Sequence, residues 1–192
     1  FLRTDRHPVV GFLRQEGIVF ESFDAIYDES ASYEDVYRKI VGRLLDVLEE
    51  AEASGGEVVY AVPGHPMVAE RTVQLLLEEA KTGGFELSVM PAPSFLDAVS
   101  AQLGLDPIDG WLVLDGSGLH RSQLNPQLLT VIAQVYDRAV ASDVKLTLMD
   151  VYPDEYTVIV ANALGVAGQE VIERVPLYEL DWDDARFGHL TL

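Results

Sequence analysis

The sequence predicts an α/β protein in which short strands alternate with amphipathic helices. Its 192 residues are 48% hydrophobic, which is enough for one large domain or two smaller lobes with cores of their own. Short β-branched runs are separated from amphipathic stretches by turns rich in glycine and proline. Such alternation is typical of mostly parallel sheets with helical crossovers.

The first elements are short. Phe1–Thr4 has the character of a strand end, so we expect the natural chain to begin earlier. Residues 7–17 fit a helix that stops at a glycine, and residues 18–23 alternate as a strand. The acidic stretch 24–32 is expected to be a loop.

The helix that follows has the clearest signals. Ser32 can cap it, and Asp35 lies three residues further on, in capping-box position. Apolar residues at intervals of four then line one face: Val36, Ile40, Leu44 and Leu48. We expect this helix to end at Gly55–Gly56.

The remaining elements continue the alternation. We predict further strands at 57–62, 85–90, 111–114, 128–135, 156–163 and 170–177, and helices at 67–81, 94–103 and 137–150. Glycine, serine and polar residues concentrate between Asp115 and Asn125. This predicts an N-terminal lobe of residues 1–118 and a C-terminal lobe of residues 119–192.

Composition narrows the classes of partner. Thirteen Lys and Arg stand against 32 Asp and Glu, a formal charge of -19, which disfavours nucleic acids and anionic membranes because both are bound by clustered basic residues. There are no cysteines, so disulfides, zinc-thiolate sites and thiol nucleophiles are excluded. No signal-peptide pattern opens these residues, and none of their apolar runs approaches membrane-spanning length. We expect a cytoplasmic protein.

No metal site is predicted. None of the four histidines is paired with another at metal-ligand spacing. The acidic group around Trp182, formed by Asp181, Asp183 and Asp184, is interpreted as a solvated linker in preference to a cation site.

Three places have features of a ligand site. Pro63-Gly64-His65-Pro66 follows a predicted strand and precedes a helix, where α/β proteins bind ligands, although the same residues also suit a simple tight turn. For His65 we favour a backbone contact over catalysis. Ser94-Phe95 enters a helix, as a cap, a ligand contact or both. Gln134 ends an apolar strand and needs a partner, either backbone or ligand.

In combination these motifs resemble the tetrapyrrole (corrin/porphyrin) methylase family. The resemblance rests on Pro63–Glu70, on Pro91–Pro107 and, in the second lobe, on Leu128–Tyr136 and Arg174–Asp181. Within the family it resembles the YabN-like branch, which is found fused ahead of a MazG-type nucleotide pyrophosphohydrolase.

The resemblance implies two α/β lobes with mixed sheets flanked by helices and S-adenosylmethionine bound between them. The implied cofactor contacts are Pro63, Gly64, His65, Pro66, Val68, Ser94 and Phe95 in the first part of the chain, and Gln134, Val135, Asn162 and Ala163 in the second. His65 stands where the family more commonly has Asp. The family's opening strand and Gly-rich loop are missing from these residues and would precede Phe1.

Two functions remain open. The first is methyl transfer from S-adenosylmethionine to a small-molecule acceptor, with no catalytic residue nominated. The second is a non-catalytic domain that senses S-adenosylmethionine or supports a fused MazG-type enzyme. An unrelated small-molecule enzyme is a third reading, because fold does not fix function. Family members commonly form homodimers, so we expect one here. Because arginines are few and scattered, we do not expect a tetrapyrrole, with its many carboxylates, to be the acceptor.

Overall fold

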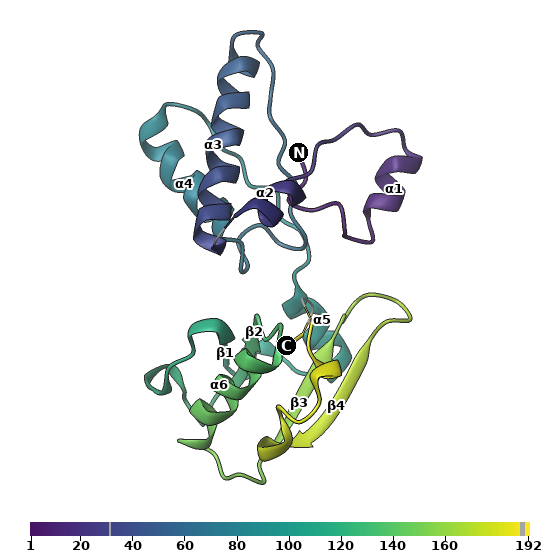
Figure 1. The fold of residues 1–192 in the computed structure, drawn as a ribbon, viewed down its shortest axis with the longest axis vertical. Helices are drawn as coiled ribbons and strands as arrows, with labels where there is room; N and C mark the ends of the chain where they lie inside the picture. The colour runs from purple at the N-terminus through teal and green to yellow at the C-terminus, as the bar shows by residue number, and fades with distance from the viewer. Residues whose placement is uncertain (31, 189–190) are drawn as a thin grey trace. The chain divides into compact units, whose positions relative to one another are not determined.

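The computed structural model of the chain describes residues 1–30, 32–188 and 191–192 (Figure 1). It is an α/β fold whose contacts divide into two compact units, Phe1–Ser94 and Phe95–Leu192. The lobe boundary predicted after residue 118 lies within the second unit, in the connection between two paired strands. Among the described residues, no helix is long and apolar enough to cross a membrane.

The described residues of the first unit form four helices: α1 (Val10–Gln15), α2 (Asp24–Glu29), α3 (Tyr33–Glu52) and α4 (Arg71–Gly83). The prediction of a loop at 24–32 was wrong, because α2 forms there. An acidic residue in its first turn suits the helix dipole, and Ile26 and Tyr27 pack onto the core. Helix α4 starts four residues later than predicted, because the residues before it form a turn.

The long helix α3 is confirmed with its cap. The Ser32 hydroxyl accepts a hydrogen bond from the Asp35 backbone N–H at 3.2 Å. The predicted face is buried at Val36, Ile40 and Leu44. Helix α4 packs beside it and is capped by Gly84, whose φ of 77° is the left-handed conformation typical of a glycine C-cap.

The strands predicted for the first unit do not form a sheet. Pairing among its described residues is limited to two isolated parallel bridges, from Leu2 to Ser22 and from Leu2 to Ala61. The strands predicted at 18–23, 57–62 and 85–90 are therefore wrong as ladders. An apolar pattern indicates a tendency to extend, but a strand also needs a hydrogen-bonded neighbour, which local sequence does not reveal.

The second unit contains both strand pairs. Helix α5 (Phe95–Leu103) precedes β1 (Trp111–Asp115), which pairs in parallel with β2 (Leu129–Ala133) from Trp111↔Leu129 to Asp115↔Ala133. After α6 (Arg138–Met149), β3 (Thr157–Asn162) and β4 (Val171–Pro176) pair antiparallel. Every element predicted here is confirmed, with ends shifted by at most two residues, and the two pairings make the strand arrangement mixed, as expected.

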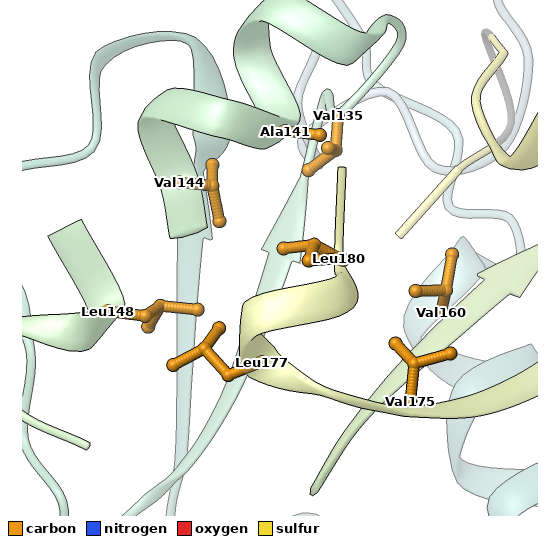
Figure 2. Packing of buried hydrophobic residues seen from close by; sticks show 8 residues of the cluster. All are labelled: Val135, Ala141, Val144, Leu148, Val160, Val175, Leu177 and Leu180. Carbon is orange, nitrogen blue, oxygen red and sulfur yellow. The ribbon is translucent and has the colours of Figure 1, made fainter. Parts of the chain in front are cut away.

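The core of the second unit joins these elements. Its buried side chains come from the residues after β2, from α6, from β3 and β4, and from the 3-10 turn η4 (Leu177–Glu179) and its cap. Figure 2 shows them converging: Val135, Ala141, Val144, Leu148, Val160, Val175, Leu177 and Leu180. Because Val135 is packed into this core, the residues that follow β2 are held in place.

Candidate functional site

In the first unit, the two turns predicted to contact a ligand lie against each other. Gly64 has a φ of 72°, and a Cβ placed on it would lie 3.7 Å from the Pro93 carbonyl oxygen and 4.0 Å from the Ser94 Cα. Glycine favours this left-handed conformation and leaves the backbone open to approach. The structure thus brings together Pro63–Val68 and the residues that precede α5.

His65 is part of the turn itself. Its Nδ1 accepts a hydrogen bond from the Met67 backbone N–H at 3.0 Å, and its carbonyl oxygen accepts one from the Val68 N–H at 2.9 Å. In this bond Nδ1 serves as the acceptor. Asp side chains make the same bond to the backbone two residues on in Asx turns. The ring therefore substitutes structurally for an Asp carboxylate.

The end of this turn is strained and leads into a buried ion pair. Ala69 has a φ of 55°, a conformation that costs a non-glycine residue about 1–3 kcal/mol. The next residue, Glu70, is 4% exposed. Its Oε2 lies 2.9 Å from Nη1 of Arg3, whose Nε donates to the Tyr27 hydroxyl at 2.9 Å.

The charges of this pair depend on each other. Burial raises the pKa of Glu70, and Arg3 and Thr72 offset part of that rise. Burial opposes the charge on Arg3, but the Glu70 carboxylate and Tyr27 outweigh it and raise the arginine pKa. The pair escaped the sequence analysis because its members are 67 residues apart, and the motif that contains Glu70 gives no sign of a partner at Arg3.

In the second unit, two predicted cofactor positions have unusual backbone conformations. Gln134 follows β2 with a φ of 64°, and Ala163 follows β3 with a φ of 51°. Positive φ is uncommon for residues other than glycine, and such residues cluster at functional sites. Sequence reasoning chose Gln134 for its polarity, but its backbone conformation is the stronger signal.

The neighbours of these two residues offer their backbones rather than their side chains. The side chain of Val135 is 5% exposed and belongs to the core. The Asn162 side chain donates to the Arg186 carbonyl oxygen and accepts from the Thr191 hydroxyl. A ligand contact at either residue would therefore use main-chain atoms.

Helix α5 and the loop after β3 are neighbours within the second unit. A Cβ on Gly165 would lie 3.5 Å from the Cβ of Ala98, in the first turn of α5. Phe95, which begins α5, and Ala163 therefore lie on adjoining elements.

The acidic residues near Trp182 are engaged within the protein. Asp181 binds Lys145 Nζ at 2.7 Å and the Ser142 hydroxyl at 2.6 Å. Asp183 accepts from a backbone N–H, and Asp184 lies 3.8 Å from Arg138. In the described part of the chain, no three His, Asp or Glu side chains gather as a metal site would require; His189 lies outside it.

Comparison with known proteins places the chain in a family. Residues 3–181 match the family described as tetrapyrrole (corrin/porphyrin) methylases. The chain is 44% identical over 181 residues to the uncharacterized protein YabN of Bacillus subtilis (strain 168). The aligned region covers 94% of this chain and 36% of YabN. The chain thus spans about a third of that relative's length.

Solved structures show the same fold. The methyltransferase CobJ aligns with a TM-score of 0.60 at 17% identity, over 79% of this chain and 68% of CobJ. The uroporphyrin-III-C-methyltransferase from Thermus thermophilus aligns with a TM-score of 0.54 at 22% identity, over 74% of this chain and 63% of that one. Diphthine synthase aligns with a TM-score of 0.59 at 18% identity, over 93% of this chain and 69% of diphthine synthase. With its family match and its fold in agreement, the chain belongs to the tetrapyrrole (corrin/porphyrin) methylases.

Proposed function

We propose that this chain binds S-adenosylmethionine and transfers its methyl group to a small-molecule acceptor. Proteins of the family use S-adenosylmethionine as methyl donor. The observation that carries the proposal is the approach of the Gly64 turn to Pro93–Ser94, which forms an open backbone surface at the residues that the family resemblance nominates. The strained Gln134 and Ala163 support it from the second unit.

Methyl transfer from S-adenosylmethionine needs little chemical participation by protein side chains. The sulfonium of S-adenosylmethionine is already activated, so the protein accelerates transfer mainly by aligning donor and acceptor. In the first unit, backbone atoms of Gly64 and Val68 would contact the donor.

The acceptor is proposed to be less anionic than a tetrapyrrole. A polycarboxylate acceptor calls for available arginines. In the structure Arg3, Arg6, Arg14 and Arg71 each lie within 4 Å of a carboxylate of the protein itself. Arg43, Arg121 and Arg174 make no such pair among the described residues. Three scattered arginines are few for a substrate with many carboxylates.

Calorimetric titration with S-adenosylmethionine and S-adenosylhomocysteine tests the proposal. We expect micromolar binding to the wild-type chain and loss of binding in Gly64→Trp, whose indole would fill the space beside Pro93. Gly42→Trp is the matched control, because a side chain there meets nothing within 4 Å. If the wild-type protein, produced at its full natural length, binds neither compound, the proposal is wrong.

A non-catalytic role is the second candidate, because no described side chain has been assigned a catalytic part. Such a domain would bind S-adenosylmethionine without turnover and influence a MazG-type partner in the same chain. A screen of acceptors with radiolabelled donor separates the two: transfer of label supports the methyltransferase. Light scattering tests the proposed homodimer in the same preparation.

A further inference from the structure

We propose that Arg3 and Glu70 are positioning residues that fix the turn of residues 62–69, and that they thereby set the affinity of this turn for its ligand. The inference deepens the proposed function and rests on it for the identity of the ligand. The fixing of the turn itself rests only on contacts within the first unit.

Arg3 contacts both ends of the turn. Its backbone N–H donates to the Ala61 carbonyl oxygen at 2.9 Å, immediately before the turn begins. Its side chain pairs with Glu70 at 2.9 Å, immediately after the turn ends. One residue therefore closes the base of the loop that carries Gly64 and His65.

Further bonds fix Arg3 itself. The Ala61 N–H donates to the Phe1 carbonyl oxygen at 2.8 Å, and Leu2 exchanges backbone hydrogen bonds with Glu21 and Phe23. The Tyr27 hydroxyl accepts from Arg3 Nε, so the guanidinium has two side-chain partners in different directions. A planar guanidinium satisfies both at once, and a lysine ammonium does not reproduce that geometry.

The turn needs such an anchor because two of its residues have left-handed backbones. Gly64 adopts this conformation readily, but Ala69 does so only where its surroundings enforce it. Glu70 follows Ala69 directly, and its side chain is 2% exposed. Removing one partner of a buried pair leaves the other charge uncompensated, so we expect the backbone at Ala69 to relax when the pair is broken.

Amide hydrogen exchange measured by NMR gives a readout that does not depend on any ligand. The amides of Met67 and Val68 are bonded to His65 within the turn, whereas the Val36 amide is bonded to the Ser32 carbonyl oxygen at the start of α3. Loosening of the turn alone accelerates exchange at the first two amides and leaves Val36 unchanged. General destabilisation accelerates all three.

The variants are Glu70→Gln and Arg3→Lys, with Arg38→Lys as matched control. Arg38 pairs with Glu34 at 3.1 Å but is 73% exposed, and such surface pairs contribute little. We expect both test variants to accelerate exchange at Met67 and Val68 selectively and to weaken S-adenosylmethionine binding about tenfold, equivalent to about 1.4 kcal/mol. The control should change neither. Should Glu70→Gln fail to fold, Arg3→Lys, which keeps the charge, carries the test.

The outcomes separate the two proposals. Selective loosening of the turn in a protein whose wild type does not bind S-adenosylmethionine supports the positioning role and contradicts the proposed cofactor. Unchanged exchange at Met67 and Val68 in a folded variant, or acceleration equal to that at Val36, overturns the positioning role whatever the wild type binds.

Discussion

At the scale of single residues, His65 shows how one side-chain atom can determine a turn. Its Nδ1 accepts from the Met67 N–H, and an Asp or Asn oxygen can occupy the same place. We therefore expect His65→Asp to keep the turn and bind S-adenosylmethionine within about twofold of wild type, whereas His65→Ala should lose about 1 kcal/mol of binding free energy. Calorimetry on the three proteins measures this. Equal affinity in His65→Ala would show that the ring bond is irrelevant.

Asp181 is a residue whose stability contribution depends on pH. Burial opposes its charge, but the hydrogen bonds from Lys145 and Ser142 outweigh it and hold its pKa below the ordinary 3.8. A lowered pKa means that the folded state is stabilised above about pH 4 and that this contribution is lost as the pH falls through the folded-state value. Asp181→Asn should cost about 1–3 kcal/mol at neutral pH.

Urea unfolding of wild type and Asp181→Asn at about pH 7 and about pH 3 checks the sign. The difference in free energy of unfolding should shrink at the lower pH. Asp184→Asn is the control, because its 3.8 Å pair with Arg138 is 56% and 73% exposed at its two side chains and contributes little. A difference that is the same at both pH values contradicts the assignment.

At the scale of elements, the lack of a side chain at Gly116 lets the residue after β1 pack against the end of β2. It follows β1, and a Cβ on it would lie 3.0 Å from Val135 Cγ2 and 3.1 Å from the Ala133 carbonyl oxygen. The second neighbour is a backbone atom at the end of β2, which cannot move aside as a flexible side chain can. We therefore expect Gly116→Ala to lower the free energy of unfolding by about 1–3 kcal/mol. Gly118→Ala, with nothing within 4 Å, should be neutral. Chemical denaturation of Gly116→Ala and Gly118→Ala measures this difference, and equal free energies of unfolding in the two variants would contradict it.

Elements specified by local chemistry were predictable from the sequence. Ser32 begins α3 and Asp137 begins α6 through bonds to backbone three residues ahead, so a short window contains the whole signal. The β-branched runs of the second unit were equally clear. The run at 57–62 carries the same pattern, yet only Ala61 finds a bridge partner, Leu2. Pairing depends on segments far apart in sequence, and a pattern does not identify them.

At the scale of the whole molecule, the same limit applies to the site. Gly64 was nominated in a turn and Ser94 at the start of a helix, but their closeness follows from the path of the chain between them and has no local signature. The Arg3–Glu70 pair was missed for the same reason. What the sequence did supply was the residue types of the proposed site: a glycine at a left-handed turn and a polar residue at the end of a strand.

The overall charge of -19 predicts a difference between the donor and its product. At neutral pH S-adenosylmethionine carries one net positive charge, because its sulfonium adds to an amino and a carboxylate group that cancel, whereas S-adenosylhomocysteine has no sulfonium and is neutral. The negative field of the protein attracts S-adenosylmethionine but exerts no net attraction on S-adenosylhomocysteine, and salt screens that field.

Raising NaCl from about 0.05 M to about 0.5 M should weaken S-adenosylmethionine binding roughly threefold and leave S-adenosylhomocysteine binding nearly unchanged. Titrations of both compounds at both salt concentrations measure the effect, with sinefungin, a cationic analogue without the sulfonium, as the control that should follow S-adenosylmethionine. Parallel behaviour of donor and product would mean that the bound ligand is shielded from the protein's net charge and that local contacts alone set its affinity.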